Sequence, residues 1–551
     1  MNISQFFEHW RIVENPFRGE EARHDAVFAR VGFKGAGAAE GPEGGPVRVG
    51  ASLPEEPAGQ TRTPADHATH HSDFEKILGD LAKPSTAIVF GEKGSGKTAI
   101  RLQIAERVAA HNAGNGDRRI LLVAYDDLNA ALDRYHRRIG GKTPLDAFQK
   151  FRLVDHIDAI LAQIVPRLMD GIVSAGPRWP GPQAPAASPA ERLELGPDPR
   201  RIVRRLSAPE RRDLLLLQAV YDRPEVAPAR TARLRRTLRL RPLWGPLLWT
   251  VLAWIGWVPA AALAYWMFAK VEGGFQLDSN LGYGLLALVG LWATMLFKRF
   301  VWDKLGLMRL ARRVRRQVRV QNRPDTSYAR SIRHLDATLR DSSHLPLTES
   351  DEARYGMLGR LRTLLRRFGY SGLLVVIDRV DEPTLISGEP DRMKAVVWPL
   401  LNNKFLQQEG IGVKMLLPIE LRHALFKESS AFFQEARLDK QNLVERLAWT
   451  GAMLYELCDA RLKACLSPGA PPVALLDLFA EDVTGRDLVD SLDQMHQPRD
   501  AFKFLYACIS EHCSNVTAEQ QQWRIPRLIL ELVRKQQSER VQQLYRGIRP
   551  A

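Results

Sequence analysis

The chain has 551 residues, a formal net charge of +15 at pH 7 and a hydrophobic content of 45%. This length allows about three or four domains, and the hydrophobic content excludes a chain that is disordered throughout. The four cysteines (Cys458, Cys465, Cys508 and Cys513) lack the paired spacing of a zinc site, so we expect core thiols in a reducing compartment.

The first 72 residues divide into an ordered and a mobile part. Residues 1–32 contain apolar and aromatic side chains and predict a small ordered lead-in. Residues 33–70 are rich in Gly, Pro, Ala and Glu and lack periodicity, so they predict a mobile loop. A short helix is expected from Asp73 to about Leu81, ahead of the first strand.

The most specific motif of the sequence follows this helix. An apolar run from Thr86 to Phe90 predicts a strand, and the spacing of the apolar residues from Ile100 to Val108 predicts a helix. The loop between them, Gly91-Glu92-Lys93-Gly94-Ser95-Gly96-Lys97-Thr98, has the pattern Gly-x4-Gly-Lys-Ser/Thr of a P-loop. The alternative interpretation is an ordinary glycine-rich turn with a solvated lysine.

The pattern suits the binding of a nucleoside triphosphate. The glycines let successive backbone N–H groups turn inward around a polyphosphate, and the N-terminus of the helix adds positive potential. Lys97 reaches the β- and γ-phosphates, and Thr98 ligates Mg²⁺. We therefore predict the eight residues from Gly91 to Thr98 as nucleotide-binding residues, Thr98 also as a metal ligand and Lys97 also as a catalytic residue.

A second buried strand is predicted from Ile120 to Tyr125, which gives a βαβ unit with ligands at the C-terminal ends of its strands. Asp126 and Asp127 follow it. They either face the site or form a turn or helix cap, and the second role is favoured. Residues 144–173 predict a helix, residues 175–199 a proline-rich flexible segment, and residues 200–223 a further helical region.

Two uncharged runs come next. As helices, residues 243–269 would be about 40 Å long and residues 279–297 about 28 Å, against roughly 30 Å for the hydrocarbon core of a bilayer. The first run contains several Trp and Tyr residues, which suit the headgroup level. We predict a transmembrane hairpin of two helices. The alternative is a hairpin buried inside a large globular domain.

Basic residues flank these runs. Residues 229–242 hold six arginines and no acid, and residues 298–319 hold nine Lys or Arg against Asp303 alone. Because this is the positive-inside distribution, we expect both termini in the cytoplasm and localisation in the cytoplasmic (inner) membrane. The clusters either bind membrane lipid or are only topology signals. Their position beside the apolar runs argues against nucleic acid as a partner.

Residues 372–378 predict another buried strand, which ends at Asp378. After a P-loop, such an aspartate holds Mg²⁺ through water. Two further carboxylates, Asp381 and Glu382, follow within four residues. Residues 412–418 predict one more strand. Glu420 and Arg422 just beyond it are candidate γ-phosphate sensors, although a helix cap is the favoured role of Glu420.

The rest of the chain has helical patterns. They cover residues 431–466, 473–480, 489–495 and 501–509, and a helix pair within 519–546 that is broken at Pro526. We predict that these helices form a lid domain. Arg499 lies beside Pro498 at a helix start and either binds the nucleotide phosphates or forms a salt bridge with a nearby carboxylate.

The sequence thus predicts an α/β fold: a P-loop NTPase with a mainly parallel sheet flanked by helices, an inserted two-helix transmembrane hairpin and a C-terminal helical lid domain. The expected domains are the lead-in and flexible loop (1–72), the first NTPase half (73–174), a linker and helical insert (175–228), the basic-flanked hairpin (229–320), the second NTPase half (321–425) and the lid (426–551).

In this order the motifs resemble the KAP family of P-loop NTPases, whose members place transmembrane helices between the phosphate-binding loop and the Mg²⁺-binding strand. The similarity covers residues 73–510. It implies a cytoplasmic ATPase-like domain of the additional-strand class, anchored by the hairpin and linked to membrane-associated complexes or phage exclusion. Only this resemblance favours ATP over GTP.

One position departs from the family pattern. Members typically have a second acidic residue directly after the metal-binding aspartate, and this chain has Arg379. Asp381 or Glu382 replaces it as the catalytic base if the turn points either one inward, and Asp381 is slightly preferred.

These features lead to two hypotheses. The first is a membrane-anchored P-loop ATPase that uses ATP and Mg²⁺ to switch the conformation or assembly of a membrane-associated complex, in signalling or phage defence. Its partners would be membrane lipid and an unidentified protein or a second copy of the chain. The alternative is a nucleotide-gated membrane scaffold with little or no hydrolysis.

Overall fold

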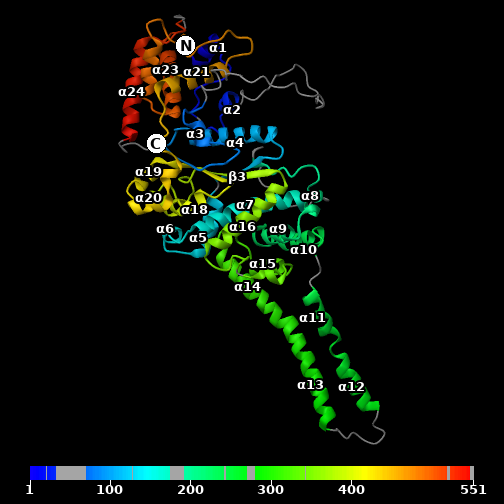
Figure 1. The fold of residues 1–551 in the computed structure, drawn as a ribbon. Helices are drawn as coiled ribbons and strands as arrows, with labels where there is room; N and C mark the ends of the chain where they lie inside the picture. Colours follow the sequence, from blue (N-terminus) through cyan, green and yellow to red (C-terminus); the bar gives the residue numbers. More distant parts are fainter. Residues whose placement is uncertain are drawn as a thin grey trace. The chain divides into compact units, whose positions relative to one another are not determined.

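The computed structural model describes residues 1–19, 21–32, 70–126, 128–173, 191–240, 244–269, 279–341, 343–517 and 522–545 (Figure 1). Most of the predicted mobile loop and most of the predicted proline-rich segment lie outside these residues. The chain forms two compact units. Unit 1 comprises Met1–Leu128, Ala187–Arg192 and Gly372–Ala551, and unit 2 comprises Asn129–Ala186 and Leu193–Ser371.

Unit 1 contains a parallel five-stranded sheet, which confirms the predicted α/β class. The strands are β1 (Ala87–Gly91), β2 (Arg119–Tyr125), β3 (Tyr370–Ile377), β4 (Ile411–Pro418) and β5 (Asn442–Val444). Their order in the sheet is β2-β3-β4-β1-β5, so β4 lies between β1 and β3. Register pairs Gly91 of β1 with Pro418 of β4, and Ile377 of β3 with Met415 of β4. The carboxyl ends of β1, β4 and β3 therefore lie at one edge of the sheet.

The sequence explains the burial of these strands. All residues of β1 and β4 are buried, as expected for near-continuous apolar runs covered on both faces. On one face, Ile100, Ile104 and Val108 of the helix α4 (Lys97–Gly114) join a core with Val89 and Val376 of the sheet. The predicted helical spacing thus corresponds to the side of α4 that packs on the sheet.

The other helices of unit 1 surround the sheet or belong to a second core. They are α1 (Ile3–His9), α2 (Ala26–Gly32), α3 (Phe74–Leu78), α17 (Pro390–Val397), α18 (Asn403–Leu406), α19 (Ile419–Leu425), α20 (Ser430–Ala436), α21 (Gly451–Ala464), α22 (Gly485–Asp493), α23 (Pro498–Asn515) and α24 (Arg527–Tyr545), with 3₁₀ turns at Trp398–Leu400, Leu438–Lys440 and Leu475–Leu478. The second core joins α1 and α2 to α21–α24. All four cysteines are buried and free, as predicted.

The predicted helical region 431–466 is wrong in its middle. Residues Asn442–Val444 form β5, which pairs in parallel with β1, and the helix α21 begins only at Gly451. The apolar residues of this stretch fit both a helix and a short buried strand, and pairing with β1 decides between them. The predicted helix 473–480 is also reduced to the 3₁₀ turn Leu475–Leu478.

Unit 2 is helical. Its helices are α5 (Asn129–Ile139), α6 (Pro144–Phe148), α7 (Leu153–Val173), α8 (Pro199–Arg205), α9 (Ala208–Tyr221), α10 (Ala227–Thr237), α11 (Trp244–Ile255), α12 (Val258–Ala269), α13 (Ser279–Leu296), α14 (Asp303–Gln317), α15 (Asp325–Ile332) and α16 (Asp351–Arg367), with a π-helical turn η3 at Phe297–Trp302 and a 3₁₀ turn at Ala337–Arg340.

Two predicted helices of this unit are divided. The helix predicted over 144–173 is interrupted between Phe148 and Leu153, where the backbone forms turns. The region 200–223 is interrupted before Ala208 because Ser207 caps a new helix there, with its side chain and that of Glu210 forming a capping box.

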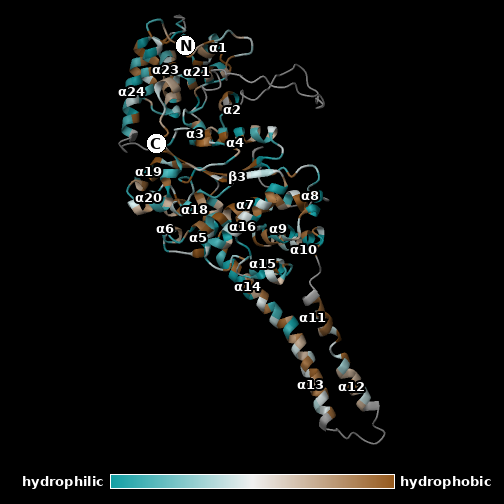
Figure 2. Cartoon of the chain, in the orientation of Figure 1, coloured by the Kyte–Doolittle hydropathy of each residue, from teal (hydrophilic) through white to brown (hydrophobic). Residues whose placement is uncertain are grey.

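Among the described residues, two helices are long and apolar enough to cross a membrane, and Figure 2 shows their parts α11, α12 and α13 mostly in brown and white. They contain residues 247–267 and 281–317, and only 11% and 0% of their most apolar windows are buried. The first is divided into α11 and α12 around Gly256 and Trp257, a break that the sequence analysis did not predict. Pro259 at the start of α12 has no N–H to continue the helical ladder. The second continues through η3 into α14, beyond the predicted end at residue 297.

The two apolar helices contact each other within unit 2. Trp292 Nε1 donates to the Ala253 carbonyl at 2.9 Å. Near the basic end, Arg299 Nε donates to Thr250 Oγ1 at 2.7 Å, and Lys298 Nζ lies 3.7 Å from the ring centroid of Trp249. Polar bonds and a cation–π contact therefore fix the register of the hairpin where its uncharged run ends.

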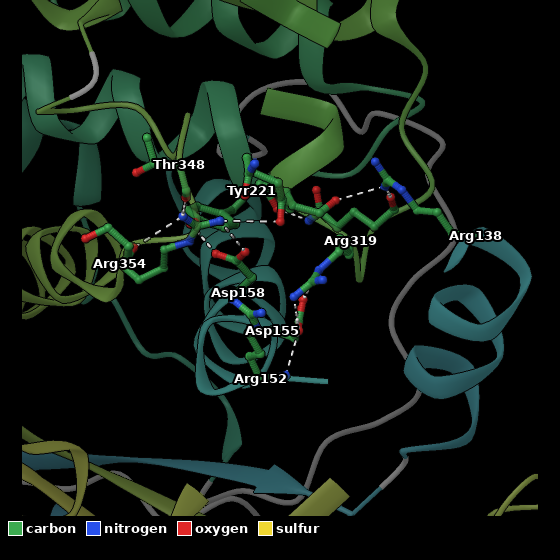
Figure 3. A network of polar contacts seen from close by, with 12 residues as sticks. Arg138, Arg152, Asp155, Asp158, Tyr221, Arg319, Thr348 and Arg354 are labelled. Carbon is green, nitrogen blue, oxygen red and sulfur yellow. Dashed lines mark hydrogen bonds and ion pairs between the residues drawn. The ribbon is translucent and has the colours of Figure 1, made fainter. Parts of the chain in front are cut away.

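A buried polar network holds the far end of α14 (Figure 3). Arg319 donates to both carboxylate oxygens of Asp155 on α7, at 2.9 and 2.7 Å. Arg138 of α5 donates to the carbonyls of Val318 and Gln321 at 2.9 and 3.0 Å. These bonds attach the end of the long helix to α5 and α7.

The centre of the network is a fully buried ion pair between Arg354 and Asp158, 3.4 Å apart. Tyr221 donates to the same carboxylate at 2.7 Å, and burial raises the pKa of Asp158 to about 6. Removing one charge of such a pair leaves the other buried without its counter-charge.

We expect Arg354→Met to destabilise unit 2 by about 3–5 kcal/mol, because it leaves the charge of Asp158 buried. The double variant Arg354→Met/Asp158→Leu should recover part of this loss. Hydrogen exchange of α7 and α16 in the full chain measures both. Arg366→Met, at an exposed position of the same helix, is the control, and an equal loss in this control would contradict the prediction.

Lys414 of β4 is fully buried, and its Nζ lies 3.5 Å from Ser85 Oγ. Burial lowers its pKa to about 7, whereas an unfolded lysine has a pKa of about 10.4. The unfolded state therefore binds the extra proton between these values, and stability falls as the pH is lowered from about 10 to about 7.

We expect Lys414→Met to remove this dependence. The variant should be more stable than the wild type by roughly 2–4 kcal/mol at pH 7, and the difference should vanish toward pH 10. Hydrogen exchange of β1 and β4 at several pH values, with exposed Lys427→Met as the control, measures the effect. A difference that does not change with pH would show that the charge is not the cause.

Candidate functional site

The loop after β1 is built on two glycines with left-handed backbone. Gly94 has a φ of 103° and Gly96 a φ of 93°, which side chains rarely tolerate. Gly96 is the N-cap of α4 and contributes no capping side chain, so the first N–H groups of this helix are not capped by it. Lys93 is exposed, whereas Ser95 is buried and donates to the Glu92 carbonyl at 2.9 Å.

Lys97, the first residue of α4, turns back toward this loop. Its Nζ donates to the carbonyls of Gly91 and Glu92 at 2.7 and 2.9 Å. Burial lowers the pKa of Lys97, and the charge of Arg499 acts in the same direction, whereas Asp381, Asp378 and Glu420 oppose this shift. Three carboxylates and one arginine thus lie within electrostatic range of the loop lysine.

Thr98 and Asp378 join the two halves of the site. Thr98 Oγ1 donates to Asp378 Oδ2 at 3.2 Å, across 280 positions of sequence. Asp378 directly follows β3 and is fully buried. Burial raises its pKa, opposed by the positive charges of Arg101 and Lys97 and by the Arg379 N–H, which donates to Oδ1 at 2.9 Å.

The turn after β3 separates its two further carboxylates. Arg379 has a left-handed φ of 61° and forms ion pairs with Glu382 and with Glu21 of the N-terminal segment. Glu382 is therefore engaged with Arg379 and is exposed to solvent. Asp381 is partly buried and, of the carboxylates, contributes most to the electrostatic environment of Lys97. A non-glycine residue with positive φ at such a place indicates local backbone strain.

Asp126, at the end of β2, is an ion-pair centre. It pairs with Arg101 of α4 and with Arg23, whose Nη2 lies 2.6 Å from Oδ2. Asp126 thus fixes Arg101, the residue whose charge most favours the ionised form of Asp378. Asp126 therefore acts on Asp378 indirectly, through Arg101, which is a role that the sequence did not predict. Asp127 lies outside the described residues.

The two candidate sensors after β4 diverge. Glu420 lies in the first turn of α19 and is among the carboxylates near Lys97. Arg422 instead pairs with Glu445 at 2.8 Å and stacks over Phe426. Of the two, Glu420 is the one among the leading charges that act on the loop lysine.

Three residues that the sequence did not predict hold the glycine-rich loop from the C-terminal side. Trp449 Nε1 donates to the Ser95 carbonyl at 2.9 Å, and Arg446 pairs with Glu92 at 2.9 Å. Gln497 also donates to Glu92. These residues lie in irregular segments beside α21 and α23, and no local pattern marks them.

Arg499, in contrast, was a candidate and lies beside the loop. A Cβ on Gly94 would stand 3.1 Å from Arg499 Cβ, and the charge of Arg499 acts on Lys97. Arg499 is the second residue of α23, a helix that begins directly after the left-handed His496 and the loop-binding Gln497.

The donors at this site suit a hard cation beside a polyphosphate. Hydroxyl and carboxylate oxygens, as in Thr98 and Asp378, are the ligands that Mg²⁺ prefers, usually with several waters and phosphate oxygens completing its shell. Within the described ranges there is no cluster of three or more His, Cys, Asp or Glu that could bind a metal by itself. The residues therefore fit Mg²⁺ held mainly by a phosphate ligand and water.

Comparisons with known proteins identify no relative. No protein-family model matches the chain, and no curated protein or solved structure is significantly similar to it. The interpretation of the site therefore rests on its own geometry.

We expect Gly94→Ala to disturb the loop. The new Cβ would lie 2.9 Å from Gln497 Oε1 and 3.1 Å from Arg499 Cβ, at a φ that alanine rarely adopts, so the local cost should be about 1–3 kcal/mol. Hydrogen exchange of residues 91–98 measures it. Gly114→Ala, whose Cβ meets nothing within 4 Å, is the control, and equal protection in both variants would refute the packing argument.

Proposed function

We propose that the protein is a membrane-anchored P-loop ATPase whose nucleotide state switches the conformation or assembly of a membrane-associated complex. The observation that carries this proposal is the meeting of Lys97 and Thr98 with Asp378 at the carboxyl edge of the sheet. Ligands bind at this edge in open parallel α/β sheets. A glycine-rich loop that enters a helix N-terminus there is suited to a polyphosphate.

The residues of the site would have separate roles in binding the nucleotide. Backbone N–H groups of residues 92–98 would bind the phosphates, and Lys97 would exchange its bonds to loop carbonyls for bonds to the β- and γ-phosphates. Thr98 and Asp378 would hold Mg²⁺, which offsets the charge of the phosphates when bound. Arg499 would add a positive charge from the helical region that we propose as the lid.

Asp381 is the better candidate for the catalytic base. A base must reach the attacking water, and the ion pair of Glu382 with Arg379 holds its carboxylate elsewhere. The influence of Asp381 on Lys97 supports a position near the phosphates. Asp381 would orient the water and accept its proton during attack on the γ-phosphate.

The strand order agrees with what the resemblance to the KAP family implies. In the additional-strand class, an extra strand separates the P-loop strand from the strand that carries the metal-binding aspartate. Here β4 lies between β1 and β3. This order supports an ATPase of that class and, with the resemblance, favours ATP.

Membrane anchoring is supported by the two exposed apolar helices. A core helix of a soluble protein would be mostly buried, whereas the apolar windows of these helices are 11% and 0% buried. With basic clusters at the outer ends of the hairpin, the proposed topology has both termini in the cytoplasm at the inner membrane. The complex that it serves would include a protein partner or a second copy of the chain.

A second candidate function is a nucleotide-gated scaffold. Arg379 occupies the position after Asp378 where the family usually has an acid, and it is held by two carboxylates, Glu21 and Glu382. If Asp381 does not reach the water, the protein would bind ATP and change shape without turnover. Variants of Lys97, Asp381 and Glu382 separate the two functions.

For the ATPase, we expect Lys97→Ala to abolish phosphate release by the detergent-solubilised full chain. Asp381→Asn should lower kcat about 10²–10⁴-fold because the general base is lost. Glu382→Gln is the matched control and should stay within a few-fold of the wild type. A steady-state phosphate-release assay measures all three.

The outcomes distinguish the candidates. Wild-type turnover at the level of Lys97→Ala, together with ATP binding, would favour the scaffold. A large loss in Glu382→Gln with none in Asp381→Asn would reverse the assignment of the base. Absence of ATP binding by the wild type would overturn both functions.

A further inference from the structure

The basic residues beside the hairpin fall into two classes. Some are used inside unit 2: Arg230 pairs with Asp170 and Asp222, and Arg319 pairs with Asp155. These arginines are largely buried by their partners. They stabilise the protein and are not available to a ligand.

Another group is exposed where the apolar helices meet the body of unit 2. Lys298 and Lys304 are exposed on the long helix, and Arg236 and Arg333 are exposed on the neighbouring helix α10 and just after α15. We call these four residues the basic collar.

Contacts place the collar residues of α10 and α15 toward the start of α14. Asp325, the first residue of α15, pairs with Arg312 and Arg315 near the end of α14, and α15 packs back along that helix, so its own end lies toward the start of α14. Arg235 of α10 donates to the His334 carbonyl at 2.5 Å, which brings α10 to the same end of α15.

The pKa of His334 is lowered by burial and then by the charges of Arg333, Arg235, Arg236 and Arg340. The charge of Asp303, the first residue of α14, in turn acts on Arg340. Asp336 acts on Arg340 more strongly and also pairs with Arg235 at 3.5 Å. Two carboxylates therefore face these four arginines, and positive charge still dominates.

Distance along the helix decides which charges can reach a bilayer. The uncharged run ends at Phe297, and each residue beyond it rises about 1.5 Å, so Lys304 lies about 10 Å from that end and Arg313 and Arg316 about 24–28 Å. The headgroup layer adds roughly 5–8 Å to each side of the hydrocarbon core, and the Debye length is about 8 Å. Lys298 and Lys304 are within this range, Arg236 and Arg333 lie toward the same end of α14, and Arg313 and Arg316 are beyond the range.

The end of α14 cannot fold down to the membrane without breaking its attachments. Arg138 binds the carbonyls of Val318 and Gln321, and Arg319 binds Asp155 (Figure 3). The exposed arginines of the last turns of α14 are thus held away from the end of the apolar run.

We propose that the basic collar (Arg236, Lys298, Lys304 and Arg333) binds the phosphodiester headgroups of anionic phospholipids. The inference rests on the proposed membrane anchoring and goes beyond it, because it assigns lipid selectivity to four side chains and denies it to neighbouring arginines. Each basic residue near an anionic surface contributes enough attraction to change affinity about fivefold.

The test uses the full chain in detergent micelles. Native mass spectrometry during titration with phosphatidylglycerol or phosphatidylcholine gives the apparent affinity for each lipid. The wild type should prefer phosphatidylglycerol. Lys298→Gln/Lys304→Gln should weaken its binding about fivefold for each charge removed. Arg236→Gln/Arg333→Gln, which leaves the Lys298–Trp249 contact intact, should have a similar effect.

Arg313→Gln/Arg316→Gln is the matched control, since it removes the same charge from exposed positions of the same helix. It should change phosphatidylglycerol binding less than about twofold, because both side chains lie beyond the screening range. Equal losses in control and collar variants, or equal affinity of the wild type for both lipids, would overturn the proposal. Displacement of phosphatidylglycerol by inorganic phosphate would identify a phosphate site instead of a lipid site and would also overturn it.

Failure of the inference is separate from failure of the proposed function. A full chain that stays soluble and monodisperse without detergent would refute membrane anchoring itself. A chain that needs detergent and shows no headgroup preference would refute the collar alone. None of these measurements depends on nucleotide hydrolysis.

Discussion

The candidate site depends on the parallel pairing of β1 with β4 and of β4 with β3. Because parallel strands in register end at one edge, this pairing brings the loop after β1 beside the residue after β3. Thr98 and Asp378 then lie within hydrogen-bond distance although 280 positions separate them. The apolar sequences of these strands make the arrangement stable, and the buried Lys414 is an exception that costs stability at neutral pH.

The same sheet explains how the chain can hold a large insertion. Strands β2 and β3 are neighbours in the sheet, and the segments of unit 2 form most of the connection between them. A parallel pair always requires a crossover, and the entropy of closing a loop grows only slowly with its length. A helical unit with a hairpin that is apolar enough to cross a bilayer can thus be placed there without changing the strand order.

Charge is used differently in the two units. At the edge of the sheet, arginines and carboxylates alternate around Asp378, so that Arg101, Asp126 and Arg23 form a chain of contacts next to the proposed metal ligand. In unit 2, the fully buried pair Arg354–Asp158 joins the helices α16 and α7. The net charge of +15 is the excess of 78 Lys and Arg over 63 Asp and Glu, and these basic residues have separate structural roles. Only the exposed ones are candidates for binding an anionic partner.

The sequence by itself determined the strand, glycine-rich loop and helix from Ala87 to Gly114, the buried strands that end before Asp378 and at Pro418, and the two apolar helices, because each has a strong local pattern. It could not predict β5, the break at Gly256, or the contacts of Trp449 and Gln497 with the loop. Those features depend on which segment supplies the neighbouring surface. The tertiary structure also decided that Glu382 pairs with Arg379 and that the charge of Asp381 acts on Lys97. Both carboxylates follow the same turn after β3, in which Arg379 has a positive φ.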